Sequence, residues 1–152
     1  MRGPSLFQGY LDNQEATHDA FAADGWFRTG DLATLDVHGK LRLTGRVKDL
    51  INRGGVKFNP ADVEALLQKH AVLAEVAVAP IPDAVLGERA CCFVVVRPGL
   101  SLDFSSMQRH LADAGLSKFK WPERLEIVAA MPLTPTRKII KARLVQDLLQ
   151  RA

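Results

Sequence analysis

An aspartate that directly follows a glycine is the first residue whose position points to chemistry. Asp31 follows Gly30 in the run Phe-Arg-Thr-Gly-Asp-Leu at residues 27–32. A carboxylate placed after a glycine at a strand end can project into a cleft, where its two oxygens accept hydrogen bonds from vicinal hydroxyls such as those of a ribose. On these residues alone, an aspartate that only forms a turn is the alternative.

The second segment joins two consecutive glycines to basic residues. Gly54 and Gly55 close a stretch that begins at residue 45 and contains Arg46 and Lys48. Two glycines give a backbone that reaches positive φ and lets a ligand approach closely, and an arginine can bind ribose or phosphate oxygens. By itself the segment could also be the basic tip of a β-hairpin.

The third feature is a lysine in a loop rich in proline and threonine. Residues 131–141 contain two prolines and two threonines, and Lys138 stands just before an expected helix. Because proline restricts the backbone, such a loop can hold an ammonium group at a set point while still moving as a unit. A solvated basic loop is the alternative for this segment in isolation.

In this order and with this spacing, the three segments resemble the adenylate-forming superfamily, which contains acyl- and aryl-CoA synthetases, peptide-synthetase adenylation domains and luciferases. The resemblance covers essentially the whole chain and is strongest to the acyl- and aryl-CoA ligases. The segments that carry it are residues 3–4, 9–11, 24–32, 45–64, 118–123 and 131–141.

The resemblance implies a two-step reaction: a carboxylic acid and ATP form an acyl-adenylate and pyrophosphate, and a thiol then displaces AMP to give a thioester. It implies that Asp31 binds the ribose hydroxyls of ATP and that Arg46 contacts the same nucleotide. Lys138 corresponds to the catalytic lysine, which bridges the attacking carboxylate and the α-phosphate. The pattern departs at one position, because Arg137 stands where relatives commonly have glycine.

The same resemblance implies a division of the chain into two parts. Residues 1–47 would be the tail of a large N-terminal adenylation domain, and residues 48–152 would be a mobile C-terminal lid domain. Lys48 falls at the family's hinge, about which the lid rotates between the two steps. After that rotation Gly54 and Gly55 would face the pantetheine arm of the thiol.

The implied ligands are a small carboxylic acid, ATP with Mg²⁺, and coenzyme A, with neither nucleic acid nor a metal site of the chain's own. The phosphate-binding loop rich in Ser, Thr and Gly that the family carries is absent from these residues. We therefore expect a C-terminal fragment that docks on its own large domain and makes no thioester alone.

Two other functions remain open. The thiol could belong to the phosphopantetheine of a carrier protein, as in aryl-acid adenylating enzymes, although coenzyme A is preferred. The chain could also be a free-standing basic binding module without catalysis, because residues 117–152 hold eight lysines and arginines against three acidic residues.

Periodicity predicts an α+β fold, a small sheet with packed helices that follows a β-hairpin. Expected helices begin at residues 14, 59, 104 and 140, and the hairpin is expected at residues 32–44. Strands are expected at residues 26–29, 72–79, 90–97 and 124–129, with Pro80 and Pro82 read as a boundary of the second of these.

Composition sets the remaining expectations. The net charge is only +3 and 47% of the residues are hydrophobic, which predicts a globular domain with a core of its own. Cys91 and Cys92 are adjacent in an apolar run, so strand alternation predicts two reduced core residues that point to opposite faces. The chain has no apolar stretch of membrane-spanning length and no signal-peptide core, so we expect a cytoplasmic setting.

Overall fold

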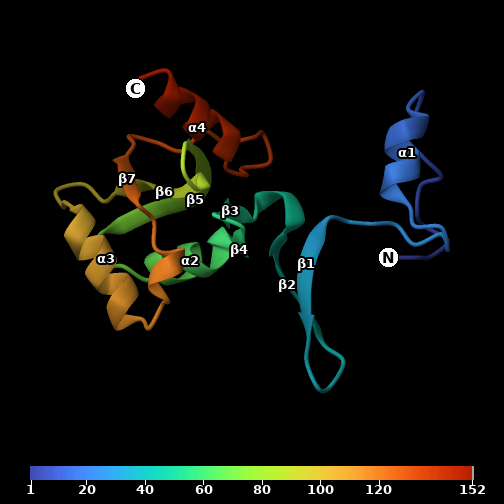
Figure 1. The fold of residues 1–152 in the computed structure, drawn as a ribbon, viewed down its shortest axis with the longest axis horizontal. Helices are drawn as coiled ribbons and strands as arrows, with labels where there is room; N and C mark the ends of the chain where they lie inside the picture. The colour runs from blue at the N-terminus through green and yellow to red at the C-terminus, as the bar shows by residue number, and fades with distance from the viewer. Residues whose placement is uncertain (152) are drawn as a thin grey trace. The chain divides into compact units, whose positions relative to one another are not determined.

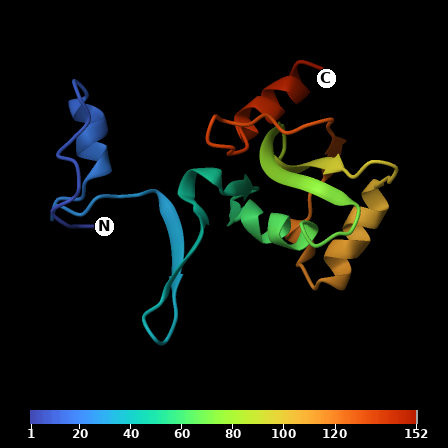
Figure 2. The same ribbon diagram turned by 180° about the vertical axis from the view of Figure 1, so that it is seen from behind.

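A computed structural model describes residues 1–151 of the chain. The residues form two compact units, which divide between Lys48 and Asp49. Figures 1 and 2 show the elements of each unit from opposite sides. The assignment of these two parts to a large domain and a mobile lid stays a prediction.

The first unit consists of a short helix and a β-hairpin. Helix α1 spans Gln14–Ala20, and the side chain of Asn13 caps it by accepting a hydrogen bond from the amide of Ala16 at 2.9 Å. Strands β1 (Asp31–Leu35) and β2 (Leu41–Arg46) pair in antiparallel fashion, as the hairpin prediction requires.

The strand predicted at residues 26–29 is wrong. Phe27 makes only an isolated bridge to Phe21. The rings of both residues also pack against Phe7, with ring centroids 5.2 and 5.8 Å away. The segment's backbone bonds are few and scattered: Phe27 bonds Met1, Trp26 accepts from Ala22, and Arg28 donates to Ala20, so no regular ladder forms among the described residues.

The second unit is the α+β domain that the periodicity predicts. It contains one sheet with strand order β4-β3-β6-β5, and β7 lies parallel to β6. The elements are β3 (Ile51–Arg53), β4 (Val56–Phe58), α2 (Pro60–Leu67), β5 (Leu73–Asp83), β6 (Gly87–Val96), α3 (Phe104–Asp113), the 3-10 turn η2 (Lys118–Lys120), β7 (Arg124–Ile127) and α4 (Lys141–Leu149).

Strand β6 separates two hydrophobic clusters. Cys92 lies in the cluster that includes residues of α2 and α3, whereas Cys91 lies in the cluster that includes Leu144 and Leu148 of α4. Figure 1 shows α4 on one side of the sheet and α2 and α3 on the other. The two cysteines therefore point to opposite faces as predicted, because successive strand residues alternate.

The boundary predicted at Pro80 and Pro82 is wrong, since β5 continues to Asp83. This strand is an edge of the sheet and pairs only with β6. The amide of Val78 points outward and donates to Glu64 Oε1 at 2.7 Å. Pro80 and Pro82 follow Val78 at intervals of two residues, so their backbone nitrogens also face away from β6. The N–H that proline lacks would therefore not have bonded to β6.

None of the helices in residues 1–151 has the length and apolar content needed to cross a membrane.

Candidate functional site

Asp31 and Arg46, which are predicted to bind a nucleotide, lie directly opposite each other on the first hairpin. They are register partners of β1 and β2, and Arg46 Nε donates to Asp31 Oδ1 at 2.9 Å. The side chain of Asp31 is 25% exposed and that of Arg46 is 52% exposed. A pair this exposed contributes at most about 1 kcal/mol to stability. Each side chain can therefore leave the other and bind a ligand at little cost.

The turn before β1 explains how Asp31 is presented. Gly30 has a φ of 72°, and its carbonyl accepts a hydrogen bond from the amide of Val47 at 2.9 Å. The amide of Asp31 donates to Thr29 Oγ1 at 3.1 Å. Because glycine reaches positive φ without a steric penalty, the chain can turn into the strand at the point where the carboxylate emerges.

The glycine pair forms the two-residue turn between β3 and β4. Gly54 and Gly55 have φ values of 58° and 87°. A two-residue hairpin turn of this kind requires positive φ at both positions, which glycine adopts readily. The amide of Gly54 donates to Leu86 O at 2.8 Å, and a Cβ there would lie 3.2 Å from Leu86 Cδ2. No atom lies within 4 Å of a Cβ built on Gly55. Gly55 therefore forms the open side of the tip.

Two glutamates that the sequence analysis did not select hold this hairpin. Glu88 Oε2 accepts from the amide of Asn52 at 2.7 Å. Glu123 forms an ion pair with Arg53, and its Oε2 accepts from the amide of Ala90 at 3.0 Å. Glu88 lies in β6 and Glu123 lies just before β7, so residue spacing cannot link either carboxylate to the hairpin, and only the folded sheet identifies them.

Lys138 lies in an exposed loop that closes on itself. Its backbone amide donates to Thr134 Oγ1 at 3.0 Å, and its carbonyl accepts from the amide of Thr134 at 2.8 Å. Leu133 and Ile139 form an isolated bridge that narrows the base of the loop. The side chain of Lys138 is exposed, and no carboxylate within residues 1–151 forms an ion pair with it. The ammonium is therefore available to an anion.

The far end of this loop is anchored by a side chain from α2. Glu64 Oε1, which accepts from the amide of Val78, also pairs with Lys141 Nζ at 2.7 Å. Lys141 is the first residue of α4, three positions after Lys138. Glu64 thus connects a helix, the sheet edge and the end of the loop, and its position in the middle of α2 carried no signal of that role.

Arg137 occupies a backbone conformation that favours glycine, with a φ of 63°. We expect Arg137→Gly to be more stable to unfolding than Arg137→Val by about 1–2 kcal/mol, because a side chain in the left-handed region costs that much and a branched one costs most. Both variants remove the guanidinium, so the loss of its charge does not enter their difference. Urea unfolding of the chain measures it, and equal stabilities would contradict the left-handed assignment.

Lys48, the predicted hinge, lies in the 3-10 turn η1 (Val47–Asp49) and is exposed. The division between the two compact units falls directly after it. The hinge role itself stays a prediction.

The basic C-terminal segment is partly neutralised within its own unit. Lys120 pairs with Asp62 at 2.7 Å and Lys141 with Glu64 at 2.7 Å. Arg124 pairs with Glu126 at 2.7 Å. A surface that grips nucleic acid needs cations available for phosphate contacts, so these pairs weaken the case for a basic binding module.

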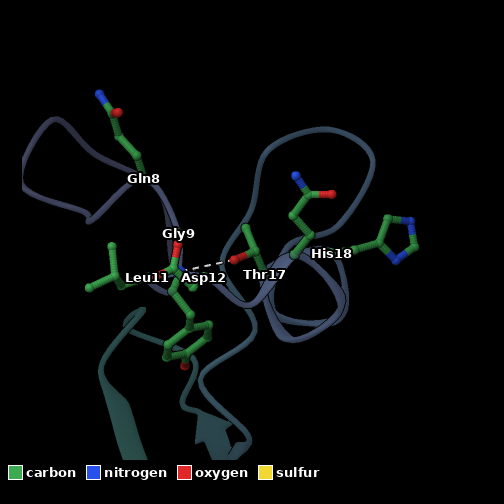
Figure 3. Close-up of a pocket in the computed structure, with 8 residues that line it drawn as sticks. Gln8, Gly9, Leu11, Asp12, Thr17 and His18 are labelled. Carbon is green, nitrogen blue, oxygen red and sulfur yellow. Dashed lines mark hydrogen bonds between the residues drawn. The ribbon is translucent and has the colours of Figure 1, made fainter.

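Three hollows within residues 1–151 are lined by none of the predicted site residues. Figure 3 shows a hollow of the first unit that runs from Gln8 to His18, where the amide of Tyr10 donates to Thr17 Oγ1 at 2.8 Å. Burial raises the pKa of the Cys91 thiol to about 12, and burial also raises the pKa of Cys92. Both thiols are therefore protonated core groups, as the sequence predicts, and neither can serve as a thiolate nucleophile.

Comparisons with known proteins identify relatives of the chain in sequence and in fold. A family model described as the AMP-binding enzyme C-terminal domain matches residues 62–138. A salicylyl-CoA synthase / salicylate adenylyltransferase from a Streptomyces species is 43% identical over 143 residues, which cover 94% of this chain and 26% of that protein. The medium-chain fatty-acid–CoA ligase of Escherichia coli K12 is 36% identical over 151 residues, which cover 99% of this chain and 27% of that protein.

Among solved structures, the ATP-bound MatB of Rhodopseudomonas palustris matches with a TM-score of 0.89 and 33% identity, over 96% of this chain and 29% of that chain. The present chain spans about a quarter of the length of the curated relatives it matches.

Proposed function

Because the chain belongs to the family of AMP-binding enzyme C-terminal domains, we propose that it is the C-terminal part of an adenylate-forming acid–thiol ligase. In the first step a carboxylate oxygen of the substrate attacks the α-phosphorus of ATP. The new bond is the acyl phosphate linkage, the bond to the β-phosphate breaks, and pyrophosphate leaves. In the second step a thiol sulfur attacks the acyl carbon, and AMP leaves with the bonding electrons.

The first step brings two anions together, and this requirement gives Lys138 its role. Negative charge builds at the reacting oxygens as carboxylate and triphosphate approach, and a fixed ammonium stabilises that charge in the transition state. Lys138 offers an exposed ammonium without an internal ion-pair partner among the described residues. This exposed cation on a closed loop is the observation that carries the proposal.

The second step has a different requirement, because the adenylate no longer needs the cation and the thiol needs an open path. We assign Gly54 and Gly55 to that path, since the turn they form has an open side at Gly55. A rotation of the lid domain about Lys48 would move the loop with Lys138 away from the reacting groups and bring the glycine turn to them. The large domain on which the lid docks would supply the acid pocket and the phosphate loop.

Coenzyme A is the thiol that we propose. Both curated relatives described above carry CoA in their names. The assay for this choice compares free coenzyme A with a pantetheinylated carrier protein as acceptor of the same acyl-adenylate. Faster transfer to the carrier protein would reassign the thiol while leaving the adenylation step in place.

ATP fits the hairpin residues, because a half-buried carboxylate beside an arginine can accept from two ribose hydroxyls while the arginine contacts the nucleotide. No group of three or more metal-ligating side chains occurs within residues 1–151. Mg²⁺ that accompanies ATP would be held chiefly by the substrate phosphates, since Mg²⁺ commonly uses one or two carboxylates together with phosphates.

The proposed nucleotide site is tested by Asp31→Asn in the complete ligase. We expect the KM for ATP in acyl-adenylate formation to rise about 10-fold or more, because the amide can accept only through one oxygen and carries no charge. ATP–pyrophosphate exchange measures the effect.

Asp36→Asn is the matched control, because Asp36 caps the far end of the same hairpin by accepting from the amides of His38 and Lys40. It should leave that KM within about 2-fold, since an asparagine oxygen can replace a capping carboxylate oxygen. An unchanged KM in Asp31→Asn, or equal effects of both substitutions, would remove Asp31 from the nucleotide site.

A further inference from the structure

The hydrogen bonds of the 131–141 loop converge on Thr134. The amide of Thr134 donates to Lys138 O at 2.8 Å, and Thr134 Oγ1 accepts from the amide of Lys138 at 3.0 Å. The carbonyl of Thr134 accepts from the amide of Arg137 at 2.8 Å. Thr134 therefore bonds the backbone amide and carbonyl of Lys138, and also the amide of Arg137.

The rest of the loop supports this clamp without touching the lysine. The amide of Ile140 donates to Pro132 O at 2.8 Å, which closes the base of the loop outside the Thr134 bonds. Thr134 Oγ1 also lies 3.0 Å from Thr136 Oγ1, so the hydroxyl can accept from Lys138 and donate to Thr136 at once. Thr134 is partly buried, whereas Lys138 and the two residues before it are exposed.

A lysine side chain has four rotatable bonds, so its ammonium can be directed only if its backbone is held. Within the described residues, the side chain of Lys138 has no hydrogen bond or ion pair that could direct it. The two bonds to Thr134 are the restraint that is present before any substrate arrives. Of the two, the bond to Oγ1 depends on the identity of the side chain.

We propose that Thr134 is a positioning residue for Lys138, and that it orders the loop in advance of adenylate formation. This inference rests on the function proposed above for Lys138. It assigns Thr134 to the first half-reaction alone, because only that step is proposed to use the ammonium. Thr134 itself touches no reacting atom in this scheme.

The test in the complete ligase compares Thr134→Val with Thr134→Ser. Valine keeps the shape of threonine but removes Oγ1, so kcat for acyl-adenylate formation should fall about 3- to 10-fold, as expected for one lost hydrogen bond. Thioester formation from supplied adenylate should change less than about 2-fold by the same reasoning. Serine restores Oγ1 and should recover adenylate formation to within about 2-fold of the parent.

Thr34→Val is the matched control, because Thr34 is exposed in β1 and the same substitution there removes a hydroxyl outside the 131–141 loop. It should leave both half-reactions within about 2-fold. Equal losses in the two half-reactions of Thr134→Val, or no recovery with serine, would overturn the proposal.

A second measurement does not depend on catalysis and uses the 152-residue chain itself. Amide hydrogen exchange at Lys138 should be about 3- to 10-fold faster in Thr134→Val than in Thr134→Ser, because the donor loses its partner. Unchanged exchange would overturn the clamp itself. Faster exchange together with normal adenylate formation would overturn the positioning role. If the parent ligase forms no adenylate at all, the proposed function fails while the exchange result still reports on the clamp.

Discussion

Lys138→Ala is expected to lower acyl-adenylate formation by about 10²- to 10³-fold, the range for removing one preorganised group that stabilises transition-state charge. Thioester formation from purified adenylate should remain within about 3-fold of the parent, since the ammonium has no role after pyrophosphate leaves. The exposed side chain of Lys138 makes no ion pair within residues 1–151, so its removal leaves no buried charge behind. The two half-reactions are measured separately in the complete ligase.

Arg143→Ala is a suitable control for the loss of a positive charge. Arg143 is 66% exposed and pairs only at 3.7 Å with Asp147 one helical turn away. An exposed pair of this kind contributes at most about 1 kcal/mol, so neither half-reaction should change by more than about 2-fold. If Lys138→Ala reduces both half-reactions equally, the catalytic role of Lys138 is wrong and a structural role replaces it.

Gly55→Leu is expected to impair thioester formation and to spare acyl-adenylate formation, which is the reverse of Lys138→Ala. The added side chain would fill the open side of the β3–β4 turn and block the proposed path of the thiol arm. Thioester formation from purified adenylate should fall about 100-fold, corresponding to about 2.7 kcal/mol of lost transition-state stabilisation. Acyl-adenylate formation should remain within about 3-fold of the parent, because the turn is proposed to face the site only after the lid rotates.

The control must separate obstruction from backbone strain. Gly55 has a φ of 87°, and leucine in that region costs about 1–2 kcal/mol wherever it is placed. Gly115→Leu imposes the same kind of strain, since Gly115 has a φ of 74° and no atom within 4 Å of an added Cβ. It lies after α3 and should spare both half-reactions. If Gly115→Leu impairs thioester formation as strongly, or Gly55→Leu spares it, the glycine turn is not part of the thiol path.

Local features of the sequence were sufficient wherever the chemistry of neighbouring residues decides the structure. The hairpin at residues 32–44 and the helix start at Asn59 were predicted because turn and capping residues act within a few positions. The predicted segment at 26–29 failed for the opposite reason. A strand requires a continuous ladder with one partner strand, and this segment instead bonds separately to Met1 and to residues 20–22, with aromatic contacts to Phe7 and Phe21.

Some members of the candidate site could be named from sequence and others could not. Asp31, Arg46 and Lys138 stand in recognisable segments, so the sequence alone identifies them as candidates. Glu64 and Glu123 stand in ordinary helical and loop positions, and their partners lie 14 and 33 residues away in the chain. Contacts over such separations depend on which strands pair, and strand pairing is a property of the whole sheet.

The sequence by itself determined which residues carry charge and reactive groups, and it determined their family through the order of three short segments. The tertiary structure decided that β5 accommodates Pro80 and Pro82, because an edge strand has amides that need no ladder partner. It also decided that Thr134 holds the backbone of Lys138, because a hydrogen bond exists only when folding brings donor and acceptor within about 3 Å. Residue type sets the available chemistry, and three-dimensional proximity sets where that chemistry can act.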